Sequence, residues 1–179
     1  MLALTGIAAA CDAPQPAATA VAGTPAEAGV TAGMRLDELL TQHQQYERIQ
    51  LKRMPSGHLQ MQVFLNGVPG NFILDTGAGA TILEEKRKAA FHLESRLSDK
   101  KFTGTGGSAT GMQFSTGNRM KIGALEIDDS SIYLVSLSHV NEAFQSMRLE
   151  EVDGSIGADI LSAHRGVIDY KNLVLYLRK

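Results

Sequence analysis

Asp75 is the residue that most constrains this chain, because it ends an apolar run and precedes a turn of small residues. The segment reads Phe72-Ile73-Leu74-Asp75-Thr76-Gly77-Ala78. A carboxylate in that place is costly to bury, so it needs either hydrogen-bond donors around it or a chemical purpose. The tripeptide Asp-Thr-Gly alone is weak evidence, since chance gives it in roughly a few per cent of chains of this length.

Two later segments follow Asp75 in order. The first reads Val152-Asp153-Gly154-Ser155-Ile156-Gly157-Ala158-Asp159-Ile160-Leu161, and the second is the strand-like stretch 167–177. Together with the Asp75 segment they resemble the retropepsin-like aspartic peptidases, the group that includes the retroviral proteases, over roughly residues 57 to 179. The resemblance implies a mainly β fold: a retropepsin-like closed β-barrel or sandwich, in a single lobe, with one or two short helices.

The resemblance also implies a role for each residue of the motif. Asp75 corresponds to the catalytic aspartate, and Thr76 to a residue that hydrogen-bonds across a dimer axis. Gly77 lets backbone N–H groups approach the carboxylate. Ala78 stands where pepsin-like enzymes commonly place a hydroxyl donor, which favours a weakly acidic rather than a strongly acidic optimum. The residues expected to support the catalytic loop are Thr76, Gly77, Ala78, Ile156 and Gly157.

Hydrolysis by two carboxylates needs one ionised group as base and one protonated group as acid, sharing a proton. This chain offers Asp75 but no second Asp-Thr-Gly or Asp-Ser-Gly, so the hypothesis is a homodimer that pairs two copies of Asp75. The function expected is an aspartic endopeptidase in which paired carboxylates activate a water to hydrolyse a peptide or protein substrate. The alternative is a monomeric, non-catalytic peptide-binding module of the same fold, with Asp75 as a turn cap.

A glycine-rich stretch, 102–111, lies between strand-like flanks. Within the resemblance it occupies the place of the flap or its base, and a plain flexible hairpin is the alternative. No helix start with Lys-Ser/Thr follows it, so a nucleotide site is rejected. The flap candidates are Gly104, Gly106, Gly107 and Gly111.

Apolar periodicity predicts the elements around these motifs. The N-terminal half is expected to contain a helix over 35–45, a strand over 59–65, a tight turn at Asn66-Gly67, a loop over 68–70 and a helix over 84–93. The later part is expected to contain two short strands over 119–127, another strand over 132–135, and a helix over 140–149 with Phe144 and Met147 on its apolar side. Asp159 is expected to cap a helix and Asp169 to begin a turn.

Residues 1–33 differ in composition from the rest of the chain. Residues 1–11 are an apolar, signal-like leader that ends in Ala-Ala-Ala-Cys, and residues 12–33 are an Ala/Pro/Thr/Gly-rich tether. Cys11 is therefore a candidate lipid attachment site, which predicts a lipoprotein anchored at the bacterial periplasmic side of a membrane. Arg35 is the first basic residue, so a plain cleaved or disordered leader is the alternative. Residues 34–179 are expected to form the peptidase domain.

Composition excludes several other classes of function. The net charge is −2 without a basic run, so no nucleic-acid partner is expected. Five scattered His residues and one Cys lack the spacing of a zinc site, so neither a metal nor another cofactor is predicted. Only 6% of residues are aromatic, which predicts a mostly aliphatic core.

Overall fold

The computed structural model of the chain describes residues 35–97, 102–104, 107–109 and 112–179. The predicted leader and tether, Cys11, and the flap candidates Gly106 and Gly111 lie outside these residues. Within the described ranges, no helix is long and apolar enough to span a membrane.

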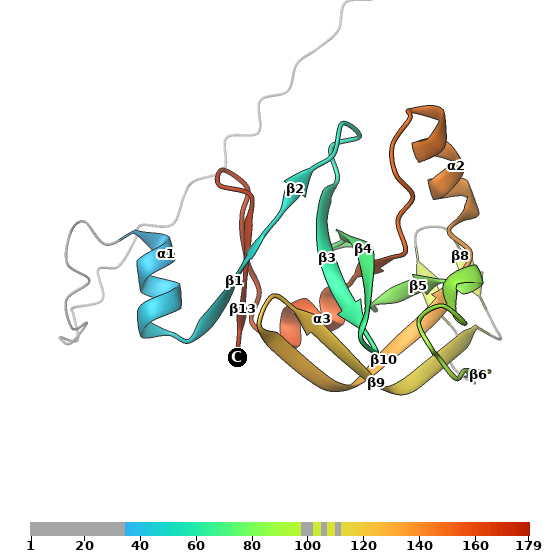
Figure 1. The fold of residues 1–179 in the computed structure, drawn as a ribbon, viewed down its shortest axis with the longest axis horizontal. Coiled ribbons are helices and arrows are strands. Elements are labelled where there is room, and N and C mark those ends of the chain that lie inside the picture. The colour runs from blue at the N-terminus through green and yellow to red at the C-terminus, as the bar shows by residue number, and fades with distance from the viewer. Residues whose placement is uncertain (1–34, 98–101, 105–106, 110–111) are drawn as a thin grey trace, which may run out of the picture. The chain divides into compact units, whose positions relative to one another are not determined.

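Six strands form a closed ring in which each pairs with the next (Figure 1). In spatial order they are β3 (Leu59–Leu65), β4 (Val68–Leu74), β11 (Gly154–Ile156), β5 (Ile82–Glu84), β10 (Leu125–Val135) and β9 (Gln113–Ile122). Pairing of β3 with β9 closes the ring, at Phe64↔Lys121 and Leu65↔Met120. The short strands β2 (Lys52–Arg53) and β6 (Arg96–Leu97) extend it at β3 and β9. The predicted mainly β, closed-barrel fold is therefore confirmed.

Strand β11 lies between two strands that come about eighty residues earlier. It runs parallel to β4 and antiparallel to β5, so the ends of both strands are held by one short segment. Gly154 makes this close packing possible, because a Cβ there would lie 2.2 Å from the Ile82 carbonyl oxygen. Asp75 follows β4 directly, so β11 lies beside the residues that lead into the Asp75 loop.

The barrel interior is aliphatic, as the composition predicts. Alternation along β3 turns Met61, Val63 and Leu65 inward, where each is at most 3% exposed. They pack in one core with Phe72 and Leu83, which are fully buried. The barrel is thus stabilised mainly by removal of aliphatic surface from water.

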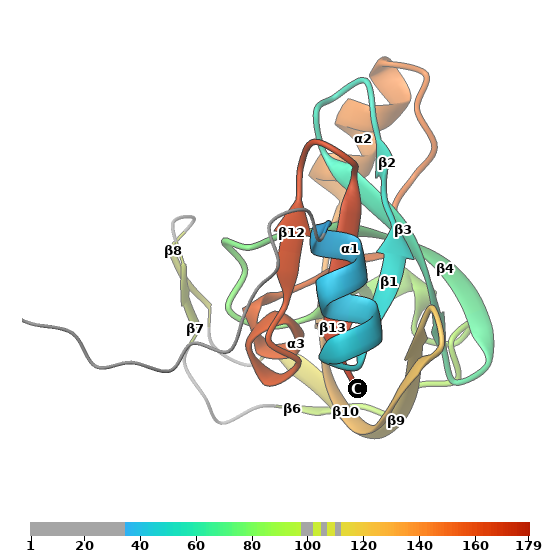
Figure 2. The same cartoon turned by 90° about the vertical axis from the view of Figure 1, so that its left-hand side faces the viewer.

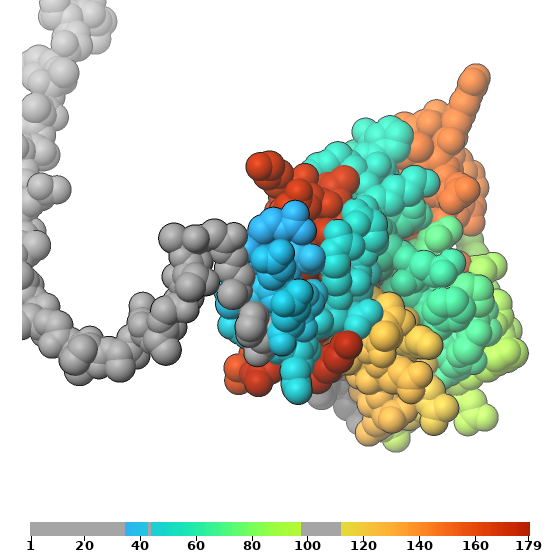
Figure 3. All heavy atoms as spheres, turned by 60° about the vertical axis from the view of Figure 1, so that its left-hand side comes forward, coloured from blue at the N-terminus to red at the C-terminus, as the bar shows by residue number. Residues whose placement is uncertain are grey.

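The ends of the described chain form a second, three-stranded sheet, ordered β1-β13-β12. Its strands are β1 (Tyr46–Gln50), β12 (Val167–Asp169) and β13 (Val174–Arg178). Helix α1 (Leu36–Glu38) continues as the π-helical turn η1 (Leu39–His43) and packs Leu40 against Tyr46, Val174 and Tyr176. Figures 2 and 3 show this helix against the C-terminal hairpin. The expected N-terminal helix is confirmed, as is the turn at Asp169, which accepts hydrogen bonds from the Lys171 and Asn172 N–H groups.

Several expected boundaries were wrong. The turn at Asn66-Gly67 is present, with φ of 52° and 84°, but β4 begins at Val68 rather than after a loop. Pro69 lacks a backbone N–H but is tolerated inside β4. On the β11 side of β4, pairing involves only Phe72–Leu74, so no strand there needs a hydrogen bond from position 69. The helix expected over 84–93 is only the 3₁₀ turn η2 (Glu85–Arg87) followed by hydrogen-bonded turns.

The expected lengths of the later strands were also too short. The short strands expected over 119–127 and 132–135 are parts of two long strands, β9 and β10, joined at Gly123. Their pairing is interrupted between Ile127 and Ile132, which hides the alternation of a continuous strand. Helix α2 (Ser138–Ser146) matches the expected helix and buries Phe144, but Met147 lies beyond it and is 48% exposed.

Glu47 on β1 joins the terminal sheet to the β9–β10 turn. Its carboxylate accepts a hydrogen bond from the Ala124 N–H at 2.9 Å and pairs with Lys179 at 3.0 Å. Burial alone would raise the pKa of Glu47, but these two contacts outweigh it and hold the pKa below the ordinary 4.5. A carboxyl whose pKa is lowered on folding stabilises the protein above its unfolded pKa, and this stabilisation is lost as pH falls through the folded pKa.

We therefore expect Glu47→Gln to flatten the acid limb of the stability curve. The free energy of unfolding, measured in urea from about pH 6 to about pH 3, should fall less steeply in the variant than in the wild type. Glu126→Gln is the matched control, because Glu126 is exposed and its ion pair with Lys121 is long, at 3.9 Å. An equal change in both variants would show that Glu47 is not a specific contributor.

Candidate active site

Asp75 leaves β4 at the point where the chain turns away from the barrel. Its N–H donates to the Ile156 carbonyl at 3.0 Å, and its own carbonyl accepts from the Ala78 N–H at 3.2 Å. The Gly77 N–H donates to Asp75 Oδ1 at 2.9 Å. The half-buried carboxylate is therefore oriented by the backbone of its own turn, with Oδ2 receiving no hydrogen bond from the described residues.

The loop rests on the segment that links β11 to helix α3 (Ala158–Ala163). The Ala158 N–H donates to the Ala78 carbonyl at 2.8 Å. Gly157 packs so closely that a Cβ there would lie 2.5 Å from the Ala80 carbonyl carbon and oxygen. The structure thus brings Ile156 and Gly157 under the Asp75 loop, in the place where supporting residues were expected.

A buried polar anchor behind the loop was missed from the sequence. Thr81, which is fully buried, donates from its N–H and its Oγ1 to the two oxygens of Asp159, at 2.9 and 2.8 Å. Thr81 Oγ1 in turn accepts from the Gly157 N–H at 3.1 Å. Asp159 was expected to be an N-cap, which was wrong: Gly157 occupies that position and Asp159 holds the loop instead.

The outer face of the loop is exposed in the single chain. Thr76, Gly77 and Gly79 all lie at the surface. The two aspartates of the adjoining segment are already engaged, because Asp159 binds Thr81 and Asp153 accepts from the Asn71 N–H and pairs with Arg87, each at 2.8 Å. The single chain therefore presents Asp75 as the carboxylate of this loop, while Asp153 and Asp159 are engaged in other contacts.

Comparisons with known proteins identify this arrangement. The model of the aspartyl protease family matches residues 61–160, more than half of the 179 residues, and includes Asp75 and its supporting segment. The chain belongs to the aspartyl protease family. No curated protein sequence matches it.

Two solved structures are similar to this chain. The crystal structure of a retropepsin-like aspartic protease from Rickettsia conorii aligns with a TM-score of 0.53 and 19% identity, covering 74% of this chain and 92% of that one. The EIAV protease complexed with the inhibitor HBY-793 aligns with a TM-score of 0.43 and 18% identity, covering 63% and 88%. The first of these supports a retropepsin-like fold for this chain.

The flap candidates of this retropepsin-like chain lie partly within a hairpin. Strands β7 (Phe102–Gly104) and β8 (Gly107–Ala109) pair antiparallel as their own two-stranded sheet, and Gly104 is opposite Gly107. The hairpin itself is therefore present at the expected place. Its role as a flap stays a prediction.

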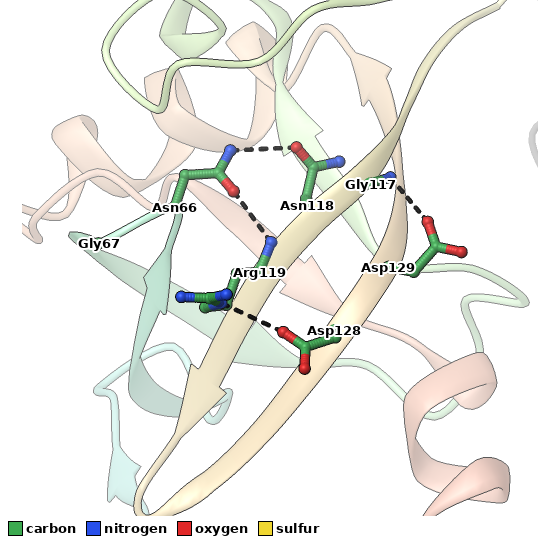
Figure 4. Close-up of a pocket in the computed structure, with 7 residues that line it drawn as sticks. All are labelled: Asn66, Gly67, Gly117, Asn118, Arg119, Asp128 and Asp129. Atoms are coloured by element: carbon green, nitrogen blue, oxygen red, sulfur yellow. Dashed lines mark hydrogen bonds and ion pairs between the residues drawn. The ribbon is translucent and has the colours of Figure 1, made fainter.

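Figure 4 shows the residues that line a large open cavity of this domain, of about 710 Å³. It is at the Asn66-Gly67 turn, which β4 separates from Asp75 by seven residues, or roughly 23 Å of strand. Its polar groups bind one another: Asn66 with Asn118, Arg119 with Asp128, and the Gly117 N–H with Asp129. Two of these contacts, Arg119 with Asp128 and Gly117 with Asp129, join β9 to β10 beside the interrupted part of their pairing.

Among the residues that the structure describes, no three or more His, Cys, Asp or Glu side chains gather in a way that could hold a metal ion.

Proposed function

We propose that this protein is an aspartic endopeptidase that works as a homodimer, with Asp75 of each protomer forming one shared catalytic pair. One carboxylate activates a water and the other, protonated, donates to the leaving nitrogen. The substrate is an extended peptide or loosened protein segment, bound as a strand between the Asp75 loop and the β7–β8 hairpin. The periplasmic, lipid-anchored location suggested by Cys11 belongs to the same proposal and rests on sequence alone.

The observation that carries the proposal is the construction of the Asp75 loop. A half-exposed carboxylate receives a backbone hydrogen bond from Gly77, while a second segment supports the loop from behind through Ala158 and Gly157. A plain turn cap would need the first of these features but not the second. Rigid positioning of a solvent-facing carboxylate is what acid–base catalysis requires.

The homodimer follows from the number of carboxylates. The proton-sharing mechanism needs two, and the neighbours Asp153 and Asp159 are committed to structural contacts. The exposed side of the loop, at Thr76 and Gly77, is where a second copy would supply the other. A monomer would leave Asp75 alone and would favour the non-catalytic binding module.

The test is cleavage of an unbiased peptide mixture over a dilution series and a pH series, with the oligomeric state measured by sedimentation. We expect specific activity to rise with protein concentration, in step with dimer formation, and to peak at weakly acidic pH. Activity independent of concentration in a protein that sediments as a monomer would exclude the shared pair. Binding without cleavage at every concentration would favour the binding module.

A further inference from the structure

A row of four side chains crosses the barrel wall next to Asp75. The strand registers place Gln60 opposite Ile73, Ile73 opposite Ser155, and Ser155 opposite Ile82. Side chains that are direct partners in neighbouring strands lie on the same face of a sheet. This row therefore lies on the outer face, because the alternating residues Phe72 and Leu83 fill the core.

A cap covers one end of the row. Phe144 of α2, which is 2% exposed, packs with Met54 and Val152, and this cluster lies against Ile73. The ring of His58, in the β2–β3 turn, contacts Phe144 edge-on with centroids 5.5 Å apart. Figure 3 shows the β2–β3 turn and α2 side by side on the surface. Further along the same face of β3, Gln62 and Phe64 are exposed, so the burial of Gln60 is due to the cap.

Two buried polar atoms beside Ile73 have no hydrogen-bond partner among the residues that the structure describes. These atoms are Gln60 Nε2 and Ser155 Oγ, which are fully buried without a hydrogen bond to any described residue. Residue Gln60 is 6% exposed and residue Ser155 is 2% exposed. Leaving such groups unpaired costs stability, and native proteins contain few of them. Both flank Ile73, which is two residues before Asp75, so the two unpaired groups lie beside the strand that leads into the Asp75 loop.

The chemistry of the pair defines what it would bind. An amide N–H and a hydroxyl both donate to a carbonyl oxygen. The surrounding residues Met54, Ile73, Phe144 and Val152 are apolar, so an ionised carboxylate would be buried without a cation. A neutral side-chain amide fits both conditions.

We propose that Gln60 and Ser155 form a subsite, covered by α2 in the free protein, that takes an Asn or Gln side chain next to the scissile bond. This rests on the proposed function, because it places a substrate across Asp75. The cap can open as a unit: Asn141 of α2 exchanges two hydrogen bonds with the Val152 backbone, at 3.1 and 2.9 Å. The N-terminal end of α2 is held to the barrel by Glu84 Oε2, which accepts a hydrogen bond from the Leu137 N–H at 2.6 Å.

The test compares the double variant Gln60→Met/Ser155→Ala with the wild type on two matched peptides. The peptides differ only in having Gln or Met next to the cleaved bond. The wild type should prefer the Gln peptide in kcat/KM, and the variant should lose about tenfold or more of that preference. Gln62→Met, on the same face but exposed, is the control and should keep the preference.

A second readout separates a binding role from a structural one. The variant should melt at the same temperature as the wild type or higher, because it removes unpaired buried polar groups. On binding of the Gln peptide to Asp75→Asn protein, amide hydrogen exchange in α2 should become faster. A lower melting temperature, an unchanged preference, or unchanged exchange in α2 would overturn the subsite.

Failure of the proposed function would look different. A wild type that cleaves neither peptide at any concentration would contradict the endopeptidase, whatever the state of the subsite. The affinities of the two peptides for Asp75→Asn protein, measured by fluorescence anisotropy, test the subsite without turnover. Equal affinities would overturn it even if cleavage is found.

Discussion

An equal mixture of wild-type and Asp75→Asn protein is expected to retain about one quarter of the activity given by the same total amount of wild type. If protomers exchange freely, about one quarter of the dimers are wild-type pairs and about half are mixed. A mixed dimer has one ionisable carboxyl and cannot share a proton between base and acid. The measurement is the initial rate of cleavage of one peptide after the two proteins have been incubated together.

Two controls make this mixing experiment decisive. Asp75→Asn alone should lose at least about 10³-fold in kcat/KM, which excludes a contaminating protease. Asp128→Asn changes an aspartate whose side chain is 78% exposed and pairs with the exposed Arg119, so a mixture with it should keep full activity. Retention of about half the activity with Asp75→Asn would mean that each protomer works alone.

Gly157→Ala is expected to destabilise the protein by about 2–4 kcal/mol and to reduce cleavage sharply. The new Cβ would lie 2.5 Å from the Ala80 carbonyl carbon and oxygen and 3.0 Å from the Ala78 carbonyl oxygen. All of these are backbone atoms, so a side-chain rotation cannot relieve the contact. The loop that carries Asp75 must shift or separate from its support. Urea unfolding gives the loss of stability, and kcat/KM on the same preparation gives the effect on the site.

Gly79→Ala provides the matched comparison within the same loop. Gly79 is exposed, and a Cβ there would meet nothing within 4 Å. This variant should stay within about 0.5 kcal/mol of the wild type in stability and should keep its activity. Equal damage from both substitutions would mean that the loop needs glycine for its backbone freedom rather than for close packing at Gly157.

Local sequence signals were sufficient for the barrel wall that leads to Asp75. The period of two over Leu59–Leu65 and the Asn66-Gly67 turn predict the β3 strand and its hairpin, and the structure has both. The position of Asp75 after an apolar strand follows from the same pattern. These features depend on neighbours in sequence, so a single chain is enough to recognise them.

Features that depend on distant residues could not be predicted in this way. Thr81 and Asp159 are 78 positions apart, and neither residue carries a local sign that the other is its partner. The length of β9 and β10 is concealed because Ser115, Asn118 and Ser130, which are polar, are buried there in a shared hydrogen-bond network. The exposure of Met147 depends on where α2 ends, which helical periodicity does not fix.

The position of β11 between β4 and β5 has a consequence for how this protein is made. The carboxylate at position 75 emerges from the ribosome long before Gly154–Ile156, which supply the strand beneath it. Until that strand is inserted, the Asp75 loop has no support, and pairing over such a separation is slow in folding. The supported form of the Asp75 loop can therefore arise only after Gly154–Ile156 have been synthesised.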